Sequence, residues 1–506
     1  MAAHNPAIGV FPTEIVTIIL REQASQHQLQ LSTRLVSRRF DTLVVAIWFE
    51  NVTLTERNTT FMFGQMNVRI FALPRSFGAS NASLRFASNV VEHTRHLVFD
   101  SEFSNSAHCL LATNFQRLDI IEYAAIPIPP NPQWTATLGQ LATKSRHPPG
   151  IHLNAILSLL GSTGTFATIP QGCVVSLKII NWSNDQAVPN RETIVGNFLR
   201  TNLQLKTLHL REIIRTRGTP RQEDTFPSLP RMTDEDRFPA LDELVLENYH
   251  WPMITTQPWD WSQIVHLEVK GTSILRFLRS ITPQSFATLQ ILRTDGYGAF
   301  SHADQFEVEI RTQELITHMR VLRRLSVRVI QMNFAWLHAI QRHGRTLHEL
   351  SYRLFDRDSN VVTQALPYTP IVGSIIDLVK VKEACANLTE LSIDLDMVYT
   401  SPSKEVWSNA LGQLRNLRRL TVYSNNMIFD DQVLDPRQHF IFFVSQFCEG
   451  LYRSKYGAPF EKVTVEIFAS IAPAPPQSAI IRYYWNGQIN LGTPHGPVIM
   501  GESWAV

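Results

Sequence analysis

A chain of 506 residues is long enough for two or more ordinary domains, or for one domain joined to an extended array. Hydrophobic residues make up 44% of it and charged residues 18%, a composition typical of a folded protein rather than a disordered one. The 46 lysines and arginines nearly balance the 44 acidic residues, and the formal charge of +2 excludes a strong overall field for collecting polyanions. We therefore expect no nucleic-acid partner.

The cysteines are few and far apart, at Cys109, Cys173, Cys385 and Cys448. No two of them form a CxxC pair and no histidine stands near them at zinc-binding spacing, so we expect no metal site and no cofactor. Isolated thiols are typical of a reducing compartment, and the N-terminus lacks the basic and apolar regions of a secretion signal. No apolar run approaches the roughly 18 residues that a membrane span needs. We therefore expect a protein of the cytoplasm, the nucleus or both, without a membrane partner.

Two short amphipathic helices are predicted within residues 9–54. In the first, Ile15, Ile18 and Ile19 recur at the i, i+3, i+4 spacing of one helix face. The second carries apolar residues at helical spacing as far as Trp48. A core is rarely self-sufficient below about 40 to 50 residues. The two helices must therefore pack on the rest of the chain, on a partner, or on both.

This N-terminal module resembles the F-box, the helical head of ubiquitin-ligase substrate receptors. The family's first motif is matched by the segment FPTEI, residues 11–15, with Phe in place of the usual Leu, and its second motif is matched by VSRRF, residues 36–40. The alternative is that the two helices only cap the chain's own core. The resemblance implies that the module binds a Skp-type adaptor through the residues Phe11, Pro12, Glu14, Ile15, Ile18, Ile19, Val36 and Phe40.

One short pattern recurs after the module: an apolar residue, two further residues, Leu, one residue, and then usually an apolar residue. LKTLHL at residues 205–210 and LDELVL at residues 241–246 are clear copies. Alternation of this kind predicts a strand in each copy, with its last two apolar side chains on one face. The central leucines of the copies are Leu97, Leu118, Leu177, Leu208, Leu244, Leu267, Leu292, Leu325, Leu350, Leu391 and Leu420.

Helices are predicted between several of these strands, at residues 152–161, 333–344 and 405–416. Strands and helices that alternate at this period are typical of leucine-rich repeats, and the region resembles a degenerate array of that family. Each repeat cannot bury its own apolar face, so neighbours stack into one continuous core. The gap of 59 residues between Leu118 and Leu177 predicts one further repeat that the pattern does not reveal. The alternative is a doubly wound sheet, although about eleven strands would be unusual for an open sheet.

The C-terminal end shows a different pattern. A predicted helix at residues 440–454 leads to a predicted strand at residues 462–468. Farther on, Asn486-Gly487 lies between two strand-like runs, which predicts a hairpin. We expect these elements to cap the last repeat, because an uncovered strand edge invites pairing with other chains.

The predicted fold class is therefore α/β, in three parts. A helical F-box-like module occupies residues 9–54, an irregular leucine-rich-repeat-like αβ solenoid occupies residues 55–440, and a helix and hairpin form a β-rich cap at residues 441–506.

Sequence motifs of catalysis are absent. The chain has no phosphate-binding loop, no Gly-x-Ser-x-Gly elbow, no His-Glu-x-x-His segment and no dinucleotide fingerprint, so we expect no enzymatic activity. Three tryptophans, Trp251, Trp259 and Trp261, follow a repeat strand and are predicted anchors for a protein substrate. The alternative is that they fold back onto the core.

Together the resemblances imply the substrate-recognition subunit of a Skp–cullin–RING (SCF-type) ubiquitin ligase. Its module would bind the adaptor, and through it the cullin–RING ligase, while its repeats would bind an unidentified protein substrate. Such a receptor acts by proximity, because it raises the effective concentration of substrate lysines near the conjugating enzyme. Two alternatives are a leucine-rich-repeat interaction scaffold without a ligase role, and an enzyme whose site is assembled from scattered polar residues.

Overall fold

The computed structural model shows a chain that divides into two compact units. Unit 1 comprises Met1–Thr219 and Glu235–Leu241, and unit 2 comprises Pro220–Asp234 and Asp242–Val506. The residues that the structure describes are 38–55, 69–72, 81–99, 115, 117–123, 136, 139–140, 150–156, 172–182, 191–213, 237–249, 259–271, 273–295, 302–329, 334–354, 375–394, 403–428, 436–471, 477–486 and 503–505.

Unit 1 is built on a ladder of parallel strands. Its strands are β1 (Asn51–Thr55), β2 (Arg69–Ala72), β3 (His96–Phe99), β4 (Ile120–Tyr123), β5 (Gly150–Ile156), β6 (Val174–Trp182) and β7 (Thr207–Ile213). They pair in the order β2-β1-β3-β4-β5-β6-β7, so that each strand from β3 to β6 lies beside its successor in the chain. The helices described for this unit include α3 (Arg38–Trp48), α4 (Asn81–His93) and α8 (Arg191–Thr201).

Unit 2 continues the same plan with more regular repeats. Its parallel strands are β8 (Glu243–Glu247), β9 (His266–Lys270), β10 (Ile291–Asp295), β11 (Arg324–Val329), β12 (Glu349–Leu354), β13 (Glu390–Asp394), β14 (Arg419–Ile428) and β15 (Lys462–Ile471). They pair in chain order. The helices are the 3₁₀ turns η5 (Trp261–Gln263) and η6 (Pro283–Phe286), and α9 (Ser273–Ser280), α10 (His302–His318), α11 (Phe334–Arg342), α12 (Ile375–Ala384), α13 (Ser403–Gly412) and α14 (Pro436–Ser454).

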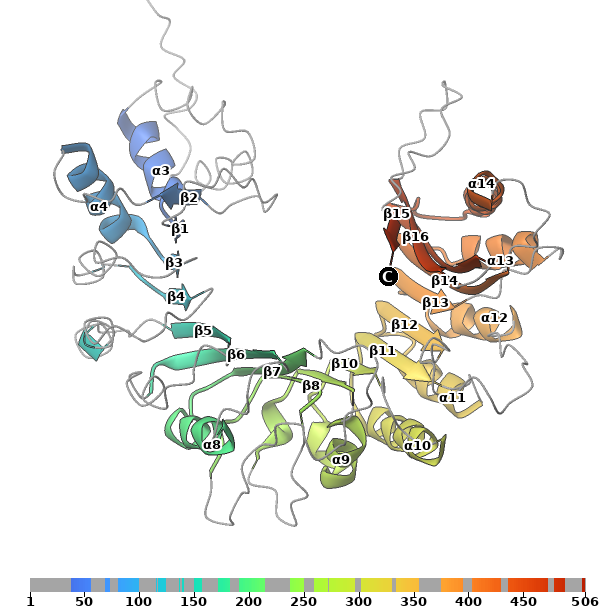
Figure 1. Ribbon diagram of the computed structural model, residues 1–506, viewed down its shortest axis with the longest axis horizontal. Coiled ribbons are helices and arrows are strands. Elements are labelled where there is room, and N and C mark those ends of the chain that lie inside the picture. Colours follow the sequence, from blue (N-terminus) through green and yellow to red (C-terminus); the bar gives the residue numbers. More distant parts are fainter. Residues whose placement is uncertain are drawn as a thin grey trace, which may run out of the picture. The chain divides into compact units, whose positions relative to one another are not determined.

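The helices α9 to α14 lie on one side of the unit 2 strands (Figure 1). A doubly wound sheet instead reverses its strand order at a switch point and carries helices on both faces. The described part of unit 2 has neither feature. Parallel strands that follow one another in chain order, with their helices on a single side, form a solenoid-like αβ arrangement, as the repeated sequence pattern predicts.

The central leucines stand directly opposite one another in unit 2. The register pairs Leu267 with Leu244 and Leu292, and the same row continues strand by strand to Val463. Each member is at most 2% exposed, and burial of one leucine side chain stabilises a fold by about 1.5 to 3 kcal/mol. This row is the spine of the core, and its members are Leu244, Leu267, Leu292, Leu325, Leu350, Leu391, Leu420 and Val463.

A repeated backbone turn sets this register. The carbonyl oxygen of Arg323 accepts hydrogen bonds from the amides of His348 (2.8 Å) and Glu349 (3.1 Å) as β12 begins. The equivalent carbonyls of Val265, Gln290, His348, Thr389 and Arg418 each accept two successive amides of the next repeat in the same way. Equivalent turn residues therefore lie side by side along one edge of the sheet.

The structure corrects two predictions in unit 1. Residues 152–161 are predicted as a helix, but residues 150–156 form β5, because pairing with β4 and β6 prevails over the local helical spacing. Strand β5 is the further repeat predicted in the 59-residue gap, so that prediction is confirmed. The second correction concerns Leu118, which was predicted as a central leucine. Leu118 precedes β4, and Ile121 takes the central position of that strand, opposite Leu97 and Ile151.

Other predicted helices are confirmed, and the parallel ladder extends beyond residue 440. Helices α11 and α13 match the segments predicted at residues 333–344 and 405–416, and α14 and β15 match the predicted C-terminal helix and strand. Strand β16 (Gln477–Asn486) pairs antiparallel with β15, and β17 (Ser503–Ala505) pairs antiparallel with β16. The predicted return of the chain after Asn486-Gly487 lies outside the described residues.

Candidate interaction face

Most of the predicted adaptor-binding residues lie outside the described part of the chain. Phe40 is one of these residues and lies in helix α3, but the structure does not describe the placement of its side chain. The others, which the structure does not describe, are Phe11, Pro12, Glu14, Ile15, Ile18, Ile19 and Val36.

Helix α3 is the last helix of the predicted module, and residues 51–54, which were predicted as part of the helical module, instead belong to strand β1. Val44 is 1% exposed, and Leu43, Ile47 and Trp48 pack against it while remaining partly exposed. Helix α3 lies against α4 and β1. The described end of the module is therefore anchored on unit 1 and leaves some apolar surface open.

Two of the three predicted substrate anchors are buried in unit 2. Trp259 and Trp261 are 5% and 2% exposed, and their rings stack 5.4 Å apart with an interplanar angle of 11°. Trp261 also stacks on Phe286 at 5.4 Å and meets Phe277 edge-on at 5.9 Å. These two indoles therefore pack onto the core, which was the alternative given in the sequence analysis. Trp251 lies outside the described residues.

The face of the unit 2 ladder opposite the helices, which we call the strand face, carries the side chains that flank the central leucines of β8 to β15. Because neighbouring strands are about 4.8 Å apart, side chains at matching register positions touch across the ladder. Arg324 Nε lies 3.1 Å from Glu349 Oε2, and Arg328 Nε lies 3.4 Å from Asp295 Oδ1. Opposite charges on successive strands therefore hold each other in place.

Glu268 of β9 lies at the centre of one group of charges on the strand face. Its side chain is only 4% exposed, and Lys270 Nζ approaches Oε1 to 2.7 Å. Arg293 of β10 places Nη1 at 3.6 Å from the other carboxylate oxygen, and His266 lies 2.8 Å from Glu243. A carboxylate this buried needs cationic partners to offset its lost hydration, so this group fixes the geometry of the face at β8 to β10.

A second group lies farther along the strand face. The guanidinium of Arg353 on β12 stacks 3.7 Å from the ring centroid of Tyr423 on β14, and its Nε lies 4.0 Å from Asp394 Oδ1 on β13. The one arginine thus spans three strands. Arginine suits this position because its planar group can stack and pair at the same time.

A row of hydroxyl groups also crosses the strand face, one position after the central leucines. Its members lie directly opposite one another on five successive strands and are Ser326, Ser351, Ser392, Thr421 and Thr464. The prediction of the site from sequence missed this row, although the residue after the central leucine is Ser or Thr in LRRLSV, LHELSY, LTELSI and LRRLTV. Each hydroxyl can donate and accept a hydrogen bond, and those of β11 to β14 are partly exposed, whereas Thr464 is 4% exposed. The strand face at β11 to β14 therefore offers polar groups of both kinds in a regular array.

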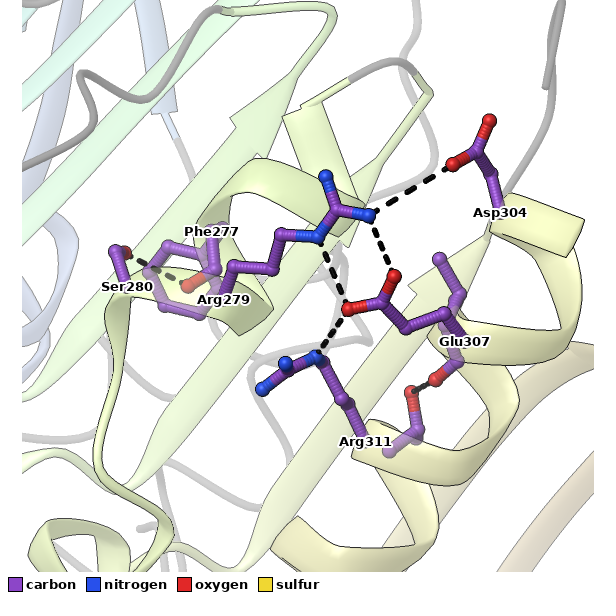
Figure 2. A network of polar contacts seen from close by, with 8 residues as sticks. Phe277, Arg279, Ser280, Asp304, Glu307 and Arg311 are labelled. Atoms are coloured by element: carbon purple, nitrogen blue, oxygen red, sulfur yellow. Dashed lines mark hydrogen bonds and ion pairs between the residues drawn. The ribbon is translucent and has the colours of Figure 1, made fainter.

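The helix side of unit 2 has a different kind of charge group. Figure 2 shows Glu307 of α10 held by Arg279 of α9, with Nε 2.9 Å from Oε1, and by Arg311 at 2.7 Å. The hydrogen bond from Arg279, followed by that from Arg311, lowers the pKa of Glu307 to about 2. Asp304 lies 3.8 Å from Arg279, and the whole group joins two neighbouring helices.

On unit 1 the corresponding strands carry histidines. His96 Nε2 of β3 lies 3.2 Å from Glu122 Oε2 of β4, and this hydrogen bond is the main reason that the pKa of Glu122 is lowered. His152 of β5 stands opposite Glu122, and burial lowers the pKa of His152. His96 and Glu122 therefore form a local hydrogen bond between two neighbouring strands of the ladder.

The strand face therefore presents charged groups of both signs together with hydroxyl groups. Within the described residues no group of three His, Cys, Asp or Glu side chains could hold a metal ion. None of the described helices has the length and apolar character to cross a membrane. No protein-family model matches the chain, and no curated protein matches it either.

Proposed function

We propose that this protein is the substrate-recognition subunit of an SCF-type ubiquitin ligase. Residues 9–54 bind a Skp-type adaptor, and the αβ ladder binds a protein substrate. The observation that carries the proposal is that a segment with two F-box-like motifs is followed in the chain by solenoid-like ladders of parallel strands, of which that of unit 2 has a polar strand face. The receptor performs no bond chemistry itself, since proximity of substrate and conjugating enzyme supplies the rate gain.

The partial exposure of helix α3 supports the adaptor half of the proposal. Leu43, Ile47 and Trp48 cover Val44 without being fully buried themselves. An apolar surface that the chain's own core leaves partly open suits a helical partner.

The decisive test is binding of a purified Skp-type adaptor to the full-length chain, followed by size-exclusion chromatography and calorimetry. We expect a one-to-one complex. The double variant Ile15→Asp/Ile19→Asp should weaken it by at least about 30-fold, because a charge would enter the apolar contact.

The matched control is Val379→Asp/Val406→Asp, which places the same charges at exposed apolar positions of α12 and α13. This control should bind the adaptor as the natural chain does. Absence of a complex, or equal binding by both double variants, would leave the interaction scaffold without a ligase role as the better account.

A further inference from the structure

One edge of the unit 2 ladder is strongly basic. It is formed by the turns and strand starts of β11 to β15, and its exposed cations, which we call the basic edge, are Arg320, Arg323, Arg324, Arg345, Arg415, Arg418, Arg419 and Lys462. Three carboxylates share the same turns and strand starts, Glu349, Glu390 and Glu461. Positive charge therefore exceeds negative charge at this edge.

The carboxylates neutralise only part of the basic edge. Arg324 pairs with Glu349, Arg419 lies 3.7 Å from Glu390, and Arg418 lies 3.0 Å from Glu461. Within the described part of the chain, no carboxylate pairs with Arg320, Arg323 or Arg345. These three guanidinium groups remain exposed to solvent.

The excess of charge is confined to one part of the edge. At β8 and β9 the equivalent turns carry acidic residues, Asp242, Glu243 and Asp260. A generic solvated surface would mix both signs along its whole length. The change of sign part-way along one ladder indicates a partner that is oriented by charge.

The turn geometry sets the spacing of these cations. The carbonyl oxygens of Arg323, His348, Thr389 and Arg418 each receive the two amides of the next repeat, so the Arg323–Arg324 pair and the Arg418–Arg419 pair lie on one line, three strands apart. At about 4.8 Å per strand the separation is about 14 Å, which equals about four residues of an extended peptide at about 3.3 Å each.

We propose that the basic edge binds an extended acidic segment of a protein partner, with anionic side chains about four residues apart. Arg323 pairs with no described carboxylate, and the exposed guanidinium groups of Arg418 and Arg419 keep donors beyond those that face Glu461 and Glu390. Forked donors of this kind match a carboxylate or phosphate group. A continuous nucleic-acid backbone fits less well, because Glu349, Glu390 and Glu461 would lie beneath its evenly spaced phosphates. The proposal deepens the proposed function, since this partner is the substrate that the receptor recognises.

The test measures fluorescence anisotropy of labelled twelve-residue probes with the full-length chain at low salt. One peptide carries two Glu-Glu pairs whose first residues are four apart, a second replaces each Glu by phosphoserine, and a third has the four Glu residues together. A twelve-nucleotide oligothymidylate is the fourth probe. We expect the two spaced peptides to bind best and all binding to weaken as salt rises.

The variant Arg323→Gln/Arg418→Gln should weaken binding of the spaced peptides by about tenfold. Its matched control, Arg279→Gln/Arg311→Gln, removes two arginines from the helix side and should bind the probes unchanged (Figure 2). If the first variant melts at a lower temperature than the natural chain, Arg320→Gln/Arg345→Gln replaces it, since neither arginine pairs with a described carboxylate.

Three outcomes overturn the proposal: no peptide binds, the helix-side control loses binding equally, or the oligonucleotide binds more tightly than both spaced peptides. Adaptor binding measured on the natural chain separates this inference from the proposed function. Absence of peptide binding by a natural chain that binds the adaptor would remove only the acidic partner, whereas peptide binding by a natural chain that binds no adaptor would remove only the ligase role.

Discussion

Two kinds of segment pack against the helix side of the unit 2 strands. Under β8 to β10 the chain returns through the short turns η5 and η6 and the eight-residue α9, and aromatic rings fill the layer. Trp261 stacks with Trp259 and Phe286 there and meets Phe277. Under β11 to β15 each return is a longer helix, from α10 to α14.

Small residues allow these longer helices to approach one another. A methyl group at Gly344 would lie 2.6 Å from the carbonyl carbon of Ala384, the last residue of α12. At Gly412 the same addition would meet the backbone of Ser454, the last residue of α14. A short return therefore needs large side chains to fill its layer, whereas stacked helices need residues without side chains where their ends meet.

The largest expected effect comes from removing a ring in the aromatic region. We expect Trp261→Ala to lower the free energy of unfolding by about 3 to 5 kcal/mol, because the buried indole leaves a cavity among three other rings. Urea unfolding followed by circular dichroism measures the change. Phe306→Ala, at a residue 58% exposed, should cost less than about 0.5 kcal/mol, and similar costs for the two variants would contradict the account of this region.

A smaller effect is expected where the helix ends meet. We expect Gly344→Ala to destabilise the protein by about 1 to 3 kcal/mol, since the added methyl group forces two backbones apart. The matched control is Gly139→Ala, because Gly139 has nothing within 4 Å of the added carbon. That control should be neutral or slightly stabilising in the same unfolding measurement, through the lower entropy of its unfolded chain. A neutral result at Gly344 would show that the contact between α11 and α12 can relax.

The smallest effect is expected at the boundary between the two regions, where Glu307 of α10 pairs with Arg279 of α9. The folded-state pKa of about 2 lies below the ordinary value of 4.5, so the contribution of Glu307 is fully present above about pH 4.5 and is lost as the pH falls through about 2. The urea midpoint of Glu307→Gln should therefore lie slightly below that of the natural chain at pH 7, with a narrower gap at pH 3.5. Because the group is exposed, solvent screening keeps the gap small.

The control for this pH effect is Glu314→Gln on the same helix, where the exposed carboxylate forms no ion pair within the described residues. Its midpoint should differ from that of the natural chain by the same small amount at both values of pH. A gap for Glu307→Gln that stays constant with pH would show that the ion pair does not hold in solution.

Much of the fold could be predicted from local pattern. The two-residue alternation in copies such as LDELVL predicts β8, and the helical spacing of FAWLHAIQR predicts α11. The same kind of spacing predicted a helix at residues 152–161, and that prediction is wrong at its start. Strand β5 forms there, with Ile151 and Leu153 as its alternating buried residues. The segment forms a strand rather than a helix because the neighbouring strands β4 and β6 offer pairing partners that a local pattern cannot reveal.

The candidate site was harder to predict. The F-box-like motifs and the tryptophan cluster are visible in the sequence, and Trp259 and Trp261 turn out to be buried. Successive members of the hydroxyl row lie 25 to 43 positions apart in the chain, and the basic edge likewise gathers arginines from separate turns. Only the register of the ladder brings these residues together.

The sequence by itself determined which side chains the central leucine rows of unit 2 bury, because the alternation is a property of five or six neighbouring residues. It also determined that the repeats must stack, since no single repeat can cover its own leucine. The tertiary structure decided which strand lies beside which, which arginines find a carboxylate and which remain exposed at the basic edge. Those outcomes depend on contacts between residues far apart in the chain, whose distances are set only when the whole ladder has formed.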